Sequence, residues 1–180
     1  AGFTLTAMVL GWPIGATLAA RNFKRFGLRP TLVFGAFLLP IGAVAFLILQ
    51  PGMSPLVPGF GSVVMGLGMG FLNTTAIVMI QGSVGWSERG AATASNVFAR
   101  NLGSTLGASA LGAAFSLSLA TGNGSAGSFE EIRRLLEQSG ALVADGAARL
   151  ALGASLHLTF WGVFLIAATT LVLAFLVPRP

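Results

Sequence analysis

The sequence predicts an all-α membrane protein with five transmembrane helices. Apolar residues make up 54% of the 180 residues and the mean hydropathy is +0.86, well above the values of soluble globular proteins. The apolar residues form five runs that are long enough to cross about 30 Å of hydrocarbon as helices. The runs do not alternate polar and apolar residues, as the strands of a transmembrane barrel would.

The first two predicted spans flank a basic segment. The first covers residues 2–20 and the second covers residues 31–49. The chain begins with Ala1 rather than Met, and no basic leader precedes the first apolar run. This favours a fragment that begins inside or at the edge of a transmembrane helix over a signal peptide. The second span consists mainly of Leu, Val, Phe, Ala and Ile, so we expect it to face lipid.

The third and fourth predicted spans cover residues 56–80 and 91–120 and carry most of the polar groups. The third is rich in glycine and continues with Asn73, Thr74 and Thr75, whereas the fourth contains several Ser, Thr and Asn residues and one arginine. Because polar side chains are costly in hydrocarbon, they should point into the protein or into a wet cavity. These two spans are therefore predicted to be the inner helices.

Two glycine pairs in the inner helices have the small-xxx-small spacing that lets helices approach closely. They are Gly66 with Gly70 and Gly103 with Gly107. Close packing is the simpler interpretation of both pairs. A glycine-rich helix can also bend during a conformational cycle, and the sequence does not separate these two uses.

The fifth predicted span, residues 156–177, follows a long loop over residues 121–155. The span is apolar like the second, so we expect it to face lipid. Within the loop, residues 128–138 predict a short amphipathic helix with Ser128 as its N-cap. Its apolar stripe fits either a helix on the membrane surface or a solvated connector. The only histidine, His157, is best explained by an interfacial position at the outer end of the fifth span.

The distribution of basic residues predicts the orientation of the chain. Four of the ten basic residues lie in the decapeptide 21–30. Because cytoplasmic loops carry an excess of Lys and Arg, we place loop 21–30 inside, with the C-terminus on the same side. The uncharged loop 50–55 and the loop 121–155 are then outside. The expected location is the cell membrane, with several passes through it.

Arg100 is the most informative residue of the inner helices. It lies about ten residues into the fourth span, and an arginine inside the membrane is a functional residue by default. Asn96 lies one turn away on the same face and Asn101 is adjacent, while Asn73 and Thr74 are candidates to line the same cavity from the third span. Two roles stay open for Arg100: lining a substrate cavity, or bracing a neighbouring helix near the inner interface.

Several kinds of chemistry are not predicted. The chain has no cysteine, and no Asp or Glu lies within any predicted span. We therefore predict no catalytic residue, no metal site and no cofactor. The same composition indicates that a proton-coupling carboxylate, where the whole protein has one, lies outside this segment. The net charge of +5 comes mainly from one short loop, which fits membrane topology better than a nucleic-acid partner.

Three segments carry a resemblance to a known family. They are GWPIGATLAARNFKRFGLRP (residues 11–30), MGLGMGFLNTTAIVMIQ (residues 65–81) and RGAATASNVFARNLGSTLGASALGAAF (residues 89–115). The first is similar to the cytoplasmic loop signature of the major facilitator superfamily of transporters. The other two resemble the glycine-rich helices of its fourteen-span drug:proton antiporter branch. The resemblance covers nearly the whole chain.

The basic loop keeps only part of the superfamily signature. Arg25, Gly27 and Arg29 match it, whereas Ala20 stands for a glycine and Lys24 for an aspartate. In the family, that aspartate helps to lock the inward gate through charge pairs with the other half of the protein. Lys24 cannot form those pairs, so we expect this loop to orient and pack the chain rather than to gate it.

The resemblance implies that the chain is a fragment. It would hold the second to sixth helices of a C-terminal six-helix bundle, without the first helix and the whole N-terminal half. It implies a secondary active transporter that moves small molecules by alternating access, with proton-coupled drug efflux as the main version. The implied partners are the lipid bilayer, the missing half, a small-molecule substrate and protons.

Two other classes of function stay open from the residues alone. One is a membrane scaffold or accessory subunit that does not transport, although the polar residues along two inner helices argue against it. The other is a membrane-embedded enzyme, which would need an intramembrane cluster such as paired carboxylates or a nucleophile with a base. No such cluster is visible in the sequence, so the expectation is a protein that is not an enzyme.

Overall fold

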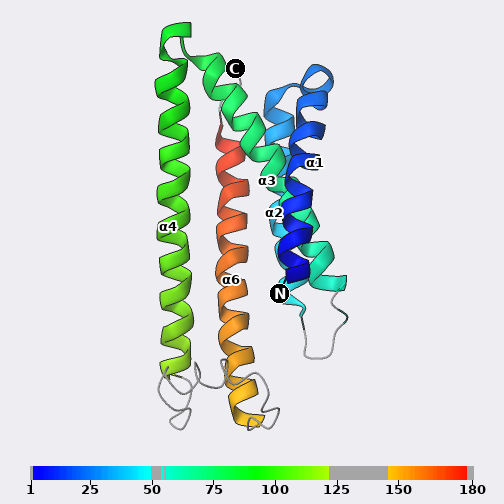
Figure 1. The fold of residues 1–180 in the computed structure, drawn as a ribbon, viewed down its shortest axis with the longest axis vertical. Helices are drawn as coiled ribbons and strands as arrows, with labels where there is room; N and C mark the ends of the chain where they lie inside the picture. The colour runs from blue at the N-terminus through cyan, green and yellow to red at the C-terminus, as the bar shows by residue number, and fades with distance from the viewer. Residues whose placement is uncertain (1, 50–53, 55, 122–145, 178–180) are drawn as a thin grey trace. The chain divides into compact units, whose positions relative to one another are not determined.

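The computed structural model describes residues 2–49, 54, 56–121 and 146–177, and these residues are helical almost throughout (Figure 1). The elements are α1 (Gly2–Phe26), α2 (Leu28–Leu47), α3 (Leu56–Ser83), the 3₁₀ turn η1 (Trp86–Glu88), α4 (Arg89–Thr121) and α6 (Gly146–Leu176). No strand occurs in this described part of the chain. The all-α prediction is confirmed.

Three of the helices are long and apolar enough to cross a membrane. They are α2, α3 and the stretch Leu156–Leu176 of α6, and they correspond to the second, third and fifth predicted spans. The other two helices, α1 and α4, have 25 and 33 residues. That α1 and α4 also span the membrane stays a prediction.

The helix ends correct several predicted boundaries. The basic decapeptide 21–30, expected to be a loop, is helical on both sides of Gly27. Arg, Lys and Phe are compatible with a helix, so α1 runs on past the apolar residues until the chain must turn. Gly27 makes that turn with φ +83°, a left-handed conformation that favours glycine. At the other end of the chain, α6 begins ten residues before the predicted fifth span. The helix predicted over residues 128–138 lies outside the described residues.

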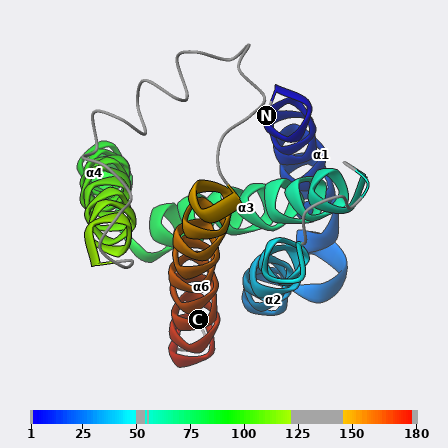
Figure 2. The ribbon, with the colours of Figure 1, turned by 90° about the horizontal axis from the view of Figure 1, so that it is seen from below.

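Two compact units make up the chain: residues 1–101 with 163–180, and residues 102–162. In the first unit, α3 passes between α1 and α2 (Figure 2). The end of α6 adds Ala174 to a small apolar cluster with Leu32 and Ala36 of α2. In the second unit, Gly162 of α6 lies beside Leu111 of α4, since a Cβ on this glycine would come within 2.8 Å of the leucine Cδ2.

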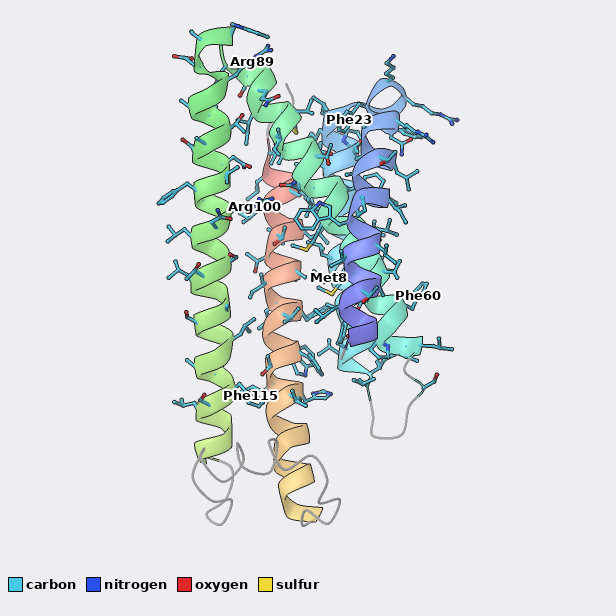
Figure 3. All side chains as sticks on the ribbon, in the orientation of Figure 1. Met8, Phe23, Phe60, Arg89, Arg100 and Phe115 are labelled. Atoms are coloured by element: carbon cyan, nitrogen blue, oxygen red, sulfur yellow. The ribbon has the colours of Figure 1, made fainter. Side chains whose placement is uncertain are left out.

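Glycines bring the backbones of α1 and α3 into contact. Gly11 and Gly15 of α1 lie against the backbone of α3, where a Cβ on Gly11 would come within 2.7 Å of the Val63 carbonyl oxygen. From the other side, Cβ atoms on Gly66 and Gly70 of α3 would overlap the carbonyl oxygens of Met8 and Trp12; Figure 3 labels Met8 beside α3. The predicted close approach at Gly66 and Gly70 is therefore confirmed, and α1 is the neighbour. A Cβ on Gly103 or Gly107 of α4 would meet no described atom within 4 Å, so a close approach at that pair stays a prediction.

A second row of glycines on α3 packs against α2. A Cβ on Gly61 would come within 2.8 Å of the Gly42 carbonyl oxygen, and one on Gly68 within 2.9 Å of the Gly35 carbonyl oxygen. The two rows lie on different faces of α3, so this helix forms backbone contacts with two neighbours at once. Phe60, at the start of α3, is exposed (Figure 3).

Candidate functional site

The second half of α3 is joined to the first half of α4 by side chains rather than by backbone contact. Arg100 of α4 donates a hydrogen bond from Nη1 to Oδ1 of Asn73 on α3, at 2.9 Å. Figure 3 labels Arg100 on the side of α4 that faces α3. Asn73 is half-buried and Arg100 is exposed. Two of the residues predicted to line a common cavity are therefore bonded to each other.

A second hydrogen bond joins the same two helices nearer to their connection. Gln81 of α3 donates from Nε2 to Oγ1 of Thr93 on α4, at 3.2 Å, and the Thr93 hydroxyl donates to the Arg89 carbonyl oxygen, at 2.8 Å. Gln81 follows Asn73 by eight residues and Thr93 precedes Arg100 by seven, so the two bonds are about two helical turns apart. We call Asn73–Arg100 and Gln81–Thr93 the polar rungs.

A cleft of about 680 Å³ opens beside the polar rungs. Its lining residues combine polar and apolar side chains: Gln81, Arg89, Gly90, Thr93, Ala94, Val97, Phe98 and Asn101. Phe98 presents an exposed ring, 68% accessible, on this side of α4. A surface of this composition suits small molecules that carry both an apolar body and hydrogen-bonding groups.

The structure treats the five predicted cavity residues differently. It bonds Asn73 to Arg100 and places Asn101 in the lining of the cleft. Thr74 and Asn96 are half-buried neighbours of these residues in α3 and α4, and their part in a cavity stays a prediction. Gln81 and Thr93 were not among the predicted cavity residues. Their spacing could have indicated that they belong to the site, because Gln81 is eight residues from Asn73 and Thr93 is seven from Arg100, and residues at these spacings lie on one helix face.

Arg89 is a further basic residue of the cleft that the prediction of cavity residues did not include. Its guanidinium carbon lies 4.9 Å from the centroid of the Trp86 ring, a cation–π contact. Its Nε has no hydrogen-bond partner among the described residues, although it is shielded from solvent. Arg89 begins α4, and Trp86 is 84% exposed. Exposed tryptophan and arginine together are typical of a membrane interface.

The three signature residues of the basic segment have structural contacts. Gly27 makes the turn between α1 and α2, and Arg25 places its guanidinium carbon 5.3 Å from the centroid of the Phe26 ring. Arg29 donates from Nη2 to the carbonyl oxygen of Phe175, at 3.0 Å. This carbonyl belongs to the last turn of α6, where carbonyls lack partners within the helix and positive charge is favourable. Arg29 therefore caps the end of α6.

The polar rungs offer amide, hydroxyl and guanidinium groups, all of which form hydrogen bonds. A guanidinium has several N–H donors, so Arg100 keeps donors for another acceptor while it holds Asn73. No group of three or more His, Cys, Asp or Glu side chains able to hold a metal ion occurs among the residues that the structure describes.

Comparison with known proteins finds a transporter. Over 112 residues, which are 62% of the chain, the sequence is 28% identical to the multidrug transporter protein MdtP of Bacillus subtilis (strain 168). The matched part is 21% of that protein, so the chain spans about a fifth of the length of this relative. No family model matches the chain, and no solved structure matches it. The chain is thus similar to a transport protein and has helices long enough to cross a membrane.

Proposed function

We propose that the chain is part of a secondary active transporter that moves small molecules across the cell membrane by alternating access. Proton-coupled efflux of several drugs is the version we favour, in the fourteen-span antiporter branch of the major facilitator superfamily. The observation that carries the proposal is the 28% identity to a multidrug transporter over 112 residues. The chain would supply the second to sixth helices of the C-terminal bundle.

The polar rungs support this proposal because they fit a substrate pathway between α3 and α4. An arginine and an asparagine on apolar helices are costly in lipid unless they face each other or water. Arg100 and Asn73 meet this condition through their hydrogen bond. Hydrogen bonds between membrane helices are worth only about 0.6 kcal/mol on average, so a substrate or a change of conformation can replace this one.

The proposal also specifies the partners of the chain, its orientation in the membrane and the source of the proton-coupling residues. The partners are the lipid bilayer, the N-terminal half, a small-molecule substrate and protons, and no cofactor, nucleic acid or enzymatic step is needed. Residues 21–30 and the C-terminus lie in the cytoplasm in this orientation. The proton-coupling acids come from outside the chain, since its five predicted spans contain no Asp or Glu.

The test is transport by the intact protein in inside-out membrane vesicles, with a panel of amphipathic cations as substrates. Arg100→Ala should lower the initial transport rate about tenfold at equal expression, the loss expected when one charged hydrogen-bond donor worth about 1.4 kcal/mol is removed. Arg100→Lys should keep part of the rate, because the charge remains while the planar fork is lost.

The matched control is Lys24→Ala, which removes an exposed positive charge outside α3 and α4. It should leave the rate within about twofold of the unmodified protein, since an exposed charge far from the substrate contributes little. Absence of transport by the unmodified protein, with any substrate of the panel, would contradict the proposed function. An unchanged rate in Arg100→Ala would instead restrict Arg100 to a structural role.

A further inference from the structure

A second pocket lies where α1 ends, α2 begins and α3 passes beneath the turn. It has a volume of about 310 Å³ and is lined by Asn22, Phe26, Pro30, Thr31, Phe34 and Phe71. Phe34 and Phe71 meet edge to face, with ring centroids 5.3 Å apart. Because three of its six lining residues are phenylalanines, the pocket suits an apolar group.

The turn at Gly27 joins α1 and α2, both of which line this pocket. The positive φ of Gly27 reverses the chain within one residue, and Thr31 fixes the reversal by donating from Oγ1 to the Gly27 carbonyl oxygen at 2.7 Å. Phe71 is 4% exposed and anchors the floor, whereas Phe34 is 52% exposed. Phe34 belongs to α2, one of the helices long and apolar enough to span a membrane, so this wall of the pocket lies on an exposed part of that helix.

A cation lies against one wall of the pocket. The guanidinium carbon of Arg25 is 5.3 Å from the centroid of the Phe26 ring, and Phe26 is one of the pocket walls. Arg21, Lys24 and Arg25 are all exposed. The sequence contains no Asp or Glu before Glu88, so no acidic residue of the first three helices neutralises this cluster. Arg29 has its own acceptor at the end of α6.

We propose that this pocket binds one anionic phospholipid, with an acyl chain between Phe26, Phe34 and Phe71 and the phosphate at Arg25. The combination of an apolar pocket and a guanidinium against its Phe26 wall, on helices that carry no acidic residue, matches a molecule with an apolar chain and an anionic head. Planar guanidinium donors bind phosphate oxygens with two parallel hydrogen bonds. The site is separate from the polar rungs and does not depend on the transport proposal.

Arg25 and Lys24 form a matched pair for testing a local site against general attraction. Asn22 and Phe26 line the pocket and are four residues apart, so they share one face of α1. Lys24 lies two residues from each of them, on the opposite face at about 100° per residue. Both side chains are exposed and carry the same charge. Long-range attraction to an anionic surface should therefore be equal for the two, whereas a local site uses only Arg25.

The experiment measures lipid binding to the intact protein, purified in detergent, by native mass spectrometry with added dioleoyl phosphatidylglycerol. Arg25→Gln should lower the apparent affinity about fivefold, the effect expected of one basic residue near an anionic lipid, and Lys24→Gln should lower it less than about twofold. Arg25→Lys should bind with intermediate affinity. Equal losses in Arg25→Gln and Lys24→Gln would overturn the proposal, because they would show attraction without a site.

A second set of measurements tests the head group and the acyl chain separately. Dioleoyl phosphatidylcholine has the same chains and a zwitterionic head. It should bind to the unmodified protein more weakly than phosphatidylglycerol does, whereas the Arg25→Gln variant should bind the two lipids with equal affinity. Glycerol 3-phosphate, which has the phosphate without the chains, should not displace the phospholipid at equal concentration. Asn22→Trp, which fills the pocket, should lower phosphatidylglycerol binding without changing elution from a sizing column. Displacement by glycerol 3-phosphate, or full binding to a correctly eluting Asn22→Trp protein, would overturn the proposal.

Discussion

The two halves of α3 hold their neighbours in opposite ways. In the first half, Gly61 to Gly70 bring the backbone of α3 against backbone atoms of α1 and α2. In the second half, Asn73 and Gln81 reach α4 through single hydrogen bonds beside an open cleft. One helix thus has two kinds of helix contact less than one turn apart along its axis. We call the close-packed contact at Gly61 to Gly70 the tight junction and the hydrogen-bonded contact at Asn73 and Gln81 the loose junction.

The difference matters because the two junctions respond differently to movement. Close-packed backbones lose many small dispersion contacts together when they separate, so the α1–α3–α2 packing should behave as one rigid body. A hydrogen bond between polar side chains exchanges easily for one to water or to a ligand. Movement within this part of the molecule is therefore expected between α3 and α4, where the polar rungs lie.

The largest expected effect comes from the smallest change at the tight junction. A Cβ at Gly70 would overlap the Trp12 carbonyl oxygen and come within 2.7 Å of the Ala16 amide nitrogen. Both contacts are backbone atoms, so α1 itself must shift. Gly70→Ala should destabilise the protein by about 2 kcal/mol, the range expected for overpacking. Thermal unfolding in detergent, followed by tryptophan fluorescence, measures this loss, and an unchanged midpoint would contradict the close backbone contact.

The loose junction should give a smaller, specific effect. Asn73→Ala and Arg100→Ala each remove one partner of the hydrogen bond at 2.9 Å, and a double-mutant cycle isolates what the two share. The coupling energy should be about 0.6 kcal/mol, the average for hydrogen bonds between membrane helices. Unfolding of the single and double variants under the same conditions measures it. A coupling near 2 kcal/mol would show that α4 is held as firmly as α1 and would remove the distinction between the halves.

Much of this arrangement could be predicted from residue type. Glycine spacing predicted the close approach at Gly66 and Gly70, while the prediction that α3 and α4 are the inner helices, from the cost of polar groups in lipid, stays a prediction. Spacing alone did not say which helix would approach. The second glycine row, with Gly61 and Gly68, faces α2. A small residue permits contact on its face, while the choice of neighbour depends on the turn that sets the direction of the next helix.

The pairing of the polar residues was beyond sequence reasoning for a related reason. Asn73 and Arg100 are 27 residues apart, and their contact depends on where α3 ends and α4 begins. Thr75 shows the converse case. It was grouped with the polar residues of an inner helix, and the structure buries it fully, with its hydroxyl donating to the Phe71 carbonyl oxygen of the same helix. A threonine can satisfy its hydroxyl within its own helix, whereas Arg100 and Asn73 bond to each other across two helices.

The smallest effect is expected at the far end of α3, where the same substitution meets no neighbour. Gly82 lies in the last turn of the helix, is exposed, and has no described atom within 4 Å of a Cβ built on it. Gly82→Ala should change stability by no more than about 0.5 kcal/mol, toward higher stability, because alanine has the better helix propensity. This variant is the matched control for Gly70→Ala, with identical chemistry in the same helix. A loss at Gly82 as large as that at Gly70 would mean that glycine is needed along all of α3 for its flexibility, and the contrast between a packed half and an open half would then have another cause.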